Sequence, residues 1–174
     1  MEQARQAVLD TVLAARRPGT PLHVVSLHDT MNTKMREDGA IVVERPAADR
    51  LPAWVNFGNR GNAQGEADGL PLTLAAAEMR RIRAAWAQAF AAEFGVEATP
   101  GEDGGFSLNV PYKGAFETVF LGGQLQTLGE PRVGAVQVEF LREALLGPVV
   151  TAALQQPGTG WPATDTAHLE RVVA

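Results

Sequence analysis

The sequence of 174 residues contains no cysteine. Without thiols the chain cannot form disulfide bonds, use a cysteine nucleophile, or bind zinc or an iron–sulfur cluster through thiolates. Its length is typical of one domain and is sufficient to bury a hydrophobic core without covalent crosslinks. We therefore expect residues 1–174 to form a single domain, in which any metal ion is held by histidine and carboxylate side chains.

The chain also lacks long apolar runs and an excess of basic residues. No apolar run approaches the roughly 20 residues of a membrane span, and charges interrupt the apolar positions of residues 1–15, unlike those of a signal peptide. Fifteen Lys and Arg against 20 Asp and Glu give a formal net charge of −5 at pH 7. This balance argues against nucleic acid or an anionic membrane as the main partner. We expect a cytoplasmic protein with no nucleic-acid or membrane partner.

Helical and strand-like periodicities alternate along the chain. Helical spacing of apolar residues predicts helices over 2–16 and 73–94, the second beginning at an N-cap Thr73 and ending at Gly95. Short apolar or alternating runs predict strands at 22–27, 40–43, 53–57, 106–110 and 136–140, followed by helical residues split by Gly147-Pro148. This alternation predicts an α/β domain, a layered sheet with helices on both faces. The connection over 30–71 is long, and such connections are uncommon unless functional.

His28 and Asp29 follow the predicted strand 22–27, at its carboxyl end, where open α/β sheets bind ligands. A neutral imidazole there can bind Zn²⁺, and the neighbouring acid can fix its tautomer or share the metal. The alternative is a structural histidine whose hydrogen bonds are satisfied. His23 faces the opposite side of the strand from His28, and His168 has no partner visible in the sequence.

Glu139 stands in the otherwise apolar strand 136–140. Burial of an unpaired carboxylate is costly, so we expect this group to be protonated, paired, or beside a metal or substrate. It is a candidate general base, which in a hydrolase would take a proton from a metal-bound water and pass it to the leaving amine. Gln137 lies on the same strand face, which favours a pocket. The alternative is a structural carboxylate bonded to the backbone or to Arg142.

Two glycine-containing loops, 58–62 and 109–114, also contain groups suited to binding. The guanidinium of Arg60 can hold a substrate carboxylate with two hydrogen bonds. Glycines on both sides of it let the backbone approach a ligand closely. Tyr112 is the only tyrosine of the chain. Each loop taken alone is equally consistent with an ordinary turn.

In this order the segments resemble the N-formylglutamate amidohydrolases. LHVVSLHDTM at 22–31 is similar to the family's apolar strand that ends in His, a small or polar residue and Met. The sequence at 58–61 resembles its Gly-acid-Arg-Gly loop, which precedes a long helix ending in Phe-Gly. The sequence at 109–114 resembles its Asn-x-Pro-Tyr-x-Gly-Gly segment, and that at 134–139 its Gly-x-x-x-Gln-x-Glu strand. The similarity covers residues 22–148.

The resemblance implies a three-layer α/β hydrolase, similar in fold to the zinc carboxypeptidases and phosphorylase/hydrolase-like proteins, that cleaves an N-acyl amide from glutamate with zinc. It implies that His28 is a zinc ligand, Glu139 the catalytic carboxylate and Arg60 the group that binds the substrate's acid. The further substrate-binding candidates are Asn109, Tyr112 and Gly114.

The sequence departs from the family at several positions. Ala115 stands where a second glycine is usual, and the family's Cys-His-Ser is replaced by Leu27-His28-Asp29. The family's other zinc ligands, a histidine and an acid, come from a segment upstream of the His28 strand, where this sequence has one predicted helix. A catalytic zinc normally has three protein ligands.

Two hypotheses follow. The first is a zinc-dependent amide hydrolase acting on an N-acylated acidic amino acid such as N-formylglutamate, in which Asp29 or another acid is recruited as a ligand. In this hypothesis a homo-oligomer or a second chain could also complete the site. The second is a non-catalytic relative that binds an acidic amide, a peptide-like ligand or a partner protein.

Overall fold

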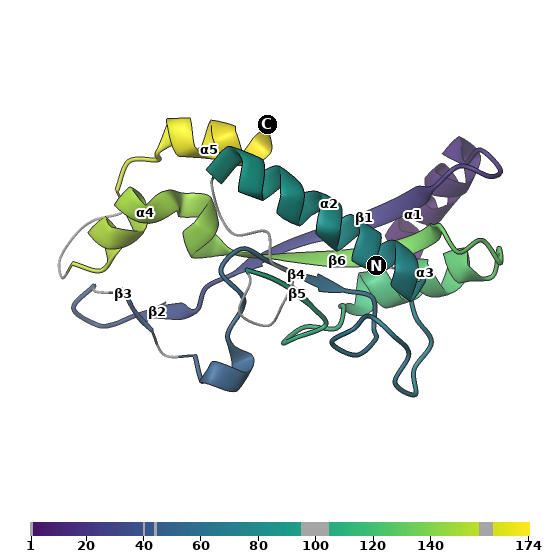
Figure 1. Ribbon diagram of the computed structural model, residues 1–174, viewed down its shortest axis with the longest axis horizontal. Coiled ribbons are helices and arrows are strands. Elements are labelled where there is room, and N and C mark those ends of the chain that lie inside the picture. Colours follow the sequence, from purple (N-terminus) through teal and green to yellow (C-terminus); the bar gives the residue numbers. More distant parts are fainter. Residues whose placement is uncertain (1, 40, 44, 95–104, 157–161) are drawn as a thin grey trace.

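The computed structural model describes residues 2–39, 41–43, 45–94, 105–156 and 162–174. Its main feature is a four-stranded sheet in the order β1-β6-β4-β5. The strands are β1 (Leu22–Thr30), β6 (Val133–Leu141), β4 (Val55–Gly58) and β5 (Phe106–Leu108). β1 runs parallel to β6, and β4 runs antiparallel to β6 and parallel to β5. The prediction that the strands at 22–27, 106–110 and 136–140 share one sheet is confirmed (Figure 1).

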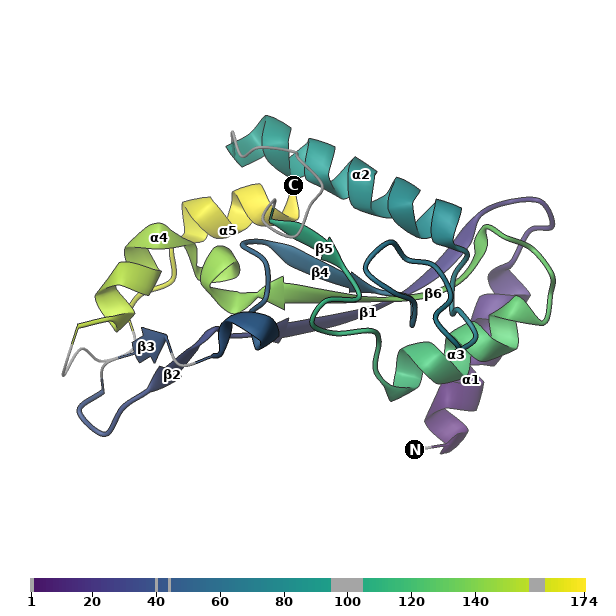
Figure 2. The same ribbon diagram turned by 60° about the horizontal axis from the view of Figure 1, so that its bottom comes forward.

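One face of this sheet is apolar and is covered by α2 (Ala76–Phe94), which lies along it in Figure 2. Period-two alternation of the strands brings their apolar residues to this side. The core is formed with Met79 and Phe90 of α2 and includes Val55, Phe57, Phe106, Leu108, Val136 and Val138. Rings of Trp54, Trp86 and Phe94 pack around this core. The predicted packing of the helix at 73–94 against the sheet is confirmed.

Among the described residues, helices cover the opposite face only where β1 and β6 begin. There α1 (Glu2–Ala15) and α3 (Phe116–Gln126) bury a second cluster, formed by Leu9, Leu121, Leu125, Val133 and Ala135. Helices therefore lie on both faces, as expected for the layered α/β class. Beyond this cluster, the second face of the sheet becomes polar.

The chain outside the main sheet forms smaller elements. β2 (Thr33–Met35) and β3 (Ile41–Val43) make a separate antiparallel pair, followed by the short 3₁₀ helix η1 (Ala47–Asp49). α4 (Arg142–Leu154) is broken at Gly147, whose φ is 81°, just before Pro148, so the predicted split is confirmed. α5 (Thr166–Val173) packs on α4 near the C-terminus. Within the described residues, no helix has both the length and the apolar character needed to cross a bilayer.

Two strand ends differ from the sequence-based expectation. β1 continues to Thr30 instead of ending at Leu27, because its last residues still pair with β6. His28 and Asp29 therefore lie inside the strand and not beyond it. β5 ends at Leu108 instead of residue 110, because Asn109 adopts a left-handed conformation with φ 56°.

The start of α2 also differs. The helix begins at Ala76 rather than at a capping Thr73. The backbone of Thr73 instead connects two other elements: its N–H donates to Asn59 O (3.0 Å), and its carbonyl accepts from Ala135 N–H (2.8 Å). The expected helix end at Gly95 lies outside the described residues.

Two adjacent glycines of α3 test the packing of this helix. A Cβ at Gly122 would lie 2.3 Å from Thr73 Cβ, whereas a Cβ at Gly123 would meet nothing within 4 Å. Gly122→Ala should lower the free energy of unfolding by about 1–3 kcal/mol through overpacking. Gly123→Ala should raise it by about 0.5–1 kcal/mol, because alanine favours the helix. Urea denaturation of both variants measures the difference, and equal effects would contradict the packing described.

Candidate functional site

A row of polar side chains crosses all four strands of the sheet. The strand registers pair His28 with Glu139, Glu139 with Asn56, and Asn56 with Ser107. Residues in register project to the same side of a sheet, so all four point away from α2. Asn56, Ser107 and Glu139 are buried. These four residues with Ser26 and Gln137 are termed the polar face.

Glu139 is hydrogen-bonded within its own strand. Gln137 Nε2 donates to Glu139 Oε2 (2.8 Å), and Gln137 Oε1 accepts from the backbone N–H of Ala115 at the start of α3. The prediction that Gln137 and Glu139 share a face is confirmed. No cation of the described residues forms an ion pair with Glu139. The carboxylate is therefore oriented by a neutral amide and not by a cation of those residues.

His28 and Asp29 point to opposite faces of β1. Ser26 Oγ and His28 Nε2 lie 3.0 Å apart on the polar face, within hydrogen-bonding distance. The Asp29 carboxylate instead accepts from Arg142 Nε, and this contact holds the pKa of the Arg142 guanidinium above its ordinary value. Because successive strand residues alternate in direction, Asp29 cannot share a metal ion with His28 in this arrangement.

The donor set on the polar face does not fit a catalytic zinc. No group of three or more His, Asp or Glu side chains that could hold a metal ion occurs in the part of the chain that the structure describes. The polar face offers His28 and Glu139, whereas a catalytic zinc normally has three protein ligands. These two residues alone do not complete a site, so no chemical step is assigned to a metal.

The two predicted loops lie side by side, joined by a pair of asparagines. Asn109 Oδ1 accepts from Asn59 N–H (2.9 Å), and Asn109 Nδ2 donates to Asn59 Oδ1 (2.8 Å) and to Asn62 O (2.8 Å). Asn109 is only 2% exposed. A Cβ at Gly58 would lie 2.7 Å from Gly114 N, so the backbones approach closely there. The structure therefore uses Asn109 and Gly114 to join the loops.

Tyr112 connects the second loop to the polar face. Its N–H donates to Asn56 Oδ1 (2.8 Å), and its carbonyl accepts from Asn56 Nδ2 (3.2 Å). Its hydroxyl accepts from Arg45 Nη1 (2.5 Å), and Arg45 Nη2 donates to Thr30 Oγ1 (3.2 Å). Thr30 follows His28 by two residues on the same face of β1. Arg45 and Tyr112 thus place a guanidinium and a hydroxyl at the edge of the polar face.

Arg45 was missed by the sequence analysis. Among the described residues, no carboxylate pairs with its guanidinium. The only sequence signal was its position in the long 30–71 connection, whose length indicated a function without selecting a residue.

Arg60 lies in the loop after β4 with a left-handed backbone, φ 70°, and its N–H donates to Lys113 O (2.6 Å). No hydrogen bond or ion pair joins its guanidinium to another described residue. The structure thus brings His28 and Glu139 together, and no contact links Arg60 to either of them. Its role stays a prediction.

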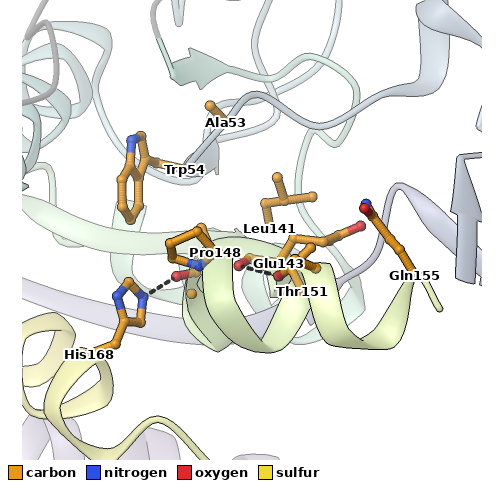
Figure 3. A pocket seen from close by; sticks show the side chains of 11 residues that line it. Ala53, Trp54, Leu141, Glu143, Pro148, Thr151, Gln155 and His168 are labelled. Atoms are coloured by element: carbon orange, nitrogen blue, oxygen red, sulfur yellow. Dashed lines mark hydrogen bonds between the residues drawn. The ribbon is translucent and has the colours of Figure 1, made fainter. Parts of the chain in front are cut away.

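A cavity of about 490 Å³ lies elsewhere, between α4, α5 and the start of β4, as Figure 3 shows. His168 lines it and lies 2.7 Å from Ala144 O through Nε2, so this histidine does have a partner. Glu143 Oε1 accepts from Asn32 N–H (3.1 Å) and Thr33 Oγ1 (2.9 Å). Because these polar groups hold α4 in place, the cavity is a weaker candidate for chemistry than the polar face.

His23 lies on the opposite side of β1 from His28, as predicted, and this is the side that α2 covers. Its Nε2 lies 2.8 Å from Oε1 of the buried Glu78. Arg81 donates to both oxygens of this carboxylate (3.0 and 2.7 Å), and Arg132 Nε lies 3.7 Å from Oε2. The hydrogen bonds from Arg81, together with the charges of Arg81, His23 and Arg132, hold the pKa of Glu78 below its usual 4.5, against the effect of burial.

No family model, no curated protein and no solved structure matches this chain.

The lowered pKa of Glu78 predicts a pH-dependent contribution to stability. A carboxyl group with a lower pKa in the folded state stabilises the protein above its unfolded pKa, and this contribution is lost as the pH falls through the folded value. Glu78→Gln should therefore destabilise the protein near pH 7, and the difference from wild type should shrink below about pH 4.5. Denaturant titrations between pH 3 and pH 7 test this, and a difference independent of pH would contradict it.

Proposed function

We propose that this protein is an amide hydrolase acting on an N-acylated acidic amino acid such as N-formylglutamate. The observation that supports it most strongly is the buried carboxylate of Glu139, in register with His28 and hydrogen-bonded by Gln137. The order of the sequence segments that resemble the N-formylglutamate amidohydrolases supports the same reaction. A fold similar to that of the zinc carboxypeptidases belongs to this proposal.

Glu139 is the general base in the proposed reaction. It takes a proton from a water molecule while the water oxygen bonds to the acyl carbon of the substrate. The carbon–nitrogen bond then breaks, and Glu139 delivers the proton to the leaving amine nitrogen. N-formylglutamate and water thus give formate and glutamate. Gln137 positions the carboxylate by donating to Oε2 and leaves Oε1 for water.

In this proposal His28 lies beside the carboxylate of Glu139 that takes up the proton. Its Nε2 is engaged with Ser26 Oγ, which limits rotation of the imidazole. The resemblance assigns His28 to zinc, whereas the described residues do not complete a zinc site. The hydrolysis assay is therefore performed both with added zinc and with a chelator.

Two arginines are candidates to bind the substrate's carboxylate. The resemblance favours Arg60, and the arrangement favours Arg45, whose guanidinium bonds Thr30 on the same strand face as His28. Successive residues on one strand face are about 7 Å apart. A carboxylate at Arg45 would place the amide of a glutamate derivative near His28 and Glu139.

The alternative is a non-catalytic protein that binds an acidic amide or peptide-like ligand on the polar face. The described residues supply no third His, Asp or Glu ligand beside His28 and Glu139, which favours this alternative. A binding protein would bind N-formylglutamate without hydrolysing it, so an assay with this one compound distinguishes the two functions.

Replacement of the proposed base tests the hydrolase. Wild type should release glutamate from N-formylglutamate, and Glu139→Gln should lower the rate by about 10²–10⁴-fold, because the amide keeps the shape and removes the base. The matched control is Glu117→Gln, an exposed carboxylate on α3 that should leave the rate unchanged. Binding of the substrate without turnover, with or without zinc, would contradict the hydrolase and support the binding protein.

Conservative substitutions distinguish the two arginines. Arg45→Lys keeps the charge but loses the planar two-bond geometry, so KM for N-formylglutamate should rise about 10-fold or more while kcat changes little. Arg60→Lys should leave KM within about twofold. Steady-state kinetics of both variants measure the effects. An increased KM in Arg60→Lys alone would assign the carboxylate to Arg60 instead.

A further inference from the structure

β1 forms one edge of the sheet and has an unpaired side. It pairs with β6 only, and the described part of the chain supplies no strand on its other side. No backbone hydrogen bond to an element other than β6 occurs between His23 and Thr30 among the described residues. A free strand edge presents N–H and C=O groups in a row that another strand can pair with.

The outer part of this edge is apolar. Val25 and Leu27 are 43% and 65% exposed, on the same face of the sheet as α2. Apolar residues in an edge strand promote pairing rather than prevent it, because native edges are usually protected by charges, proline or short length. β1 has nine residues and contains no proline. Apart from its two histidines, its only ionisable side chain is that of Asp29, near the end of the strand.

The sequence of β1 is complementary to itself. In an antiparallel pair of identical strands, residues that face each other must point to the same side of the sheet. With Ser26 facing Ser26 of the partner subunit, Val25 faces Leu27 of the partner subunit, and His23 faces Asp29 of the partner subunit. The exposed apolar residues then cover each other, and an imidazole meets a carboxylate at both ends.

We propose that two copies of this chain pair antiparallel along β1, with Ser26 at the two-fold axis. The two four-stranded sheets then form one continuous eight-stranded sheet. Such an interface is isologous, so each contact occurs twice. Both α2 helices lie on one side of the combined sheet and both polar faces on the other. The proposal does not depend on the proposed function.

The charges along the interface alternate in sign. Asp29 accepts from Arg142, and His23 lies against Glu78, within each subunit. Pairing brings His23 of the partner subunit next to Asp29. The order of the groups is then Arg142, Asp29, His23 of the partner subunit and Glu78 of the partner subunit. Each group thus has neighbours of opposite sign when the histidine is protonated. Cross-strand pairs of opposite charge stabilise the pairing of two strands.

The molar mass in solution tests the pairing. Wild type should elute from size exclusion with light scattering at twice the monomer mass of 18.5 kDa. Leu27→Asp should shift the protein to monomer, because two carboxylates would enter the apolar part of the interface. Val149→Asp is the control: Val149 is 70% exposed on α4, away from β1, and its variant should stay dimeric. Circular dichroism verifies that both variants are folded.

Single cysteines test the register. The native chain has no cysteine, so an introduced thiol can form a disulfide only with the same thiol of a second molecule. Ser26→Cys should form a disulfide-linked dimer under mild oxidation, because facing Cα atoms in antiparallel pairs lie about 4.5–5.5 Å apart. Leu27→Cys should crosslink poorly, because the two residues 27 are diagonal neighbours at about 7–8 Å.

A monomeric wild type at concentrations up to about 100 µM, or a Leu27→Asp variant as dimeric as wild type, would overturn the β1 interface. Stronger crosslinking through residue 27 than through residue 26 would overturn the proposed register.

Discussion

The parallel pairing of β1 with β6 determines which side chains meet on the polar face. It places His28 beside Glu139, two residues 111 positions apart in the sequence, on one face of the sheet. The same alternation sends His23 and Asp29 to the other face, where they meet Glu78 and Arg142. A slip of one residue would reverse all of these directions. The apolar contacts of Val136 and Val138 with the α2 core oppose such a slip.

The rest of the chain is arranged around this pairing. α2 covers the apolar face completely enough to bury Phe57 and Phe106, whereas α3 covers only the beginning of the opposite face. The polar groups lie beyond α3, where the segment at 110–115 rather than a helix covers them and buries Asn56, Ser107 and Glu139. Two connections, around Arg45 and around Tyr112, meet at the edge of the polar face through a hydrogen bond. A ligand bound there would contact strands on one side and these connections on the other.

Much of the fold could be predicted from periodicity. The apolar strands and the long amphipathic helix have strong patterns, and the sheet that contains them was expected. The end of β1 was missed because Ser26, His28 and Thr30 alternate with Val25, Leu27 and Asp29, so the polar residues resemble a loop. The start of α2 was missed because Thr73 has a capping side chain, while its backbone bonds to Asn59 and Ala135. Both hydrogen bonds join Thr73 to residues distant in the sequence, so the local pattern does not reveal them.

The candidate site could be predicted only where its residues interrupt a local sequence pattern. Glu139 and Gln137 were conspicuous because they interrupt an apolar strand, and their shared face follows from period two. Substrate binding by Asn109 stays a prediction. The structure shows that its amide joins two loops, a role that depends on a contact 50 residues away in the sequence. Arg45 has no local pattern around it, and only its distant partners Thr30 and Tyr112 reveal its position.

We propose that the polar face binds an acidic amide, and the three histidines of the chain provide a test of this binding. His28 lies on the polar face, His23 on the α2 side of β1, and His168 at the cavity beside α4. The measurement is the NMR shift of each imidazole on titration of N-formylglutamate into the Glu139→Gln variant, which should bind it with little turnover. We expect a saturable shift of His28, with His23 and His168 nearly unchanged. An unshifted His28 at saturation, or a shift confined to His168, would contradict it.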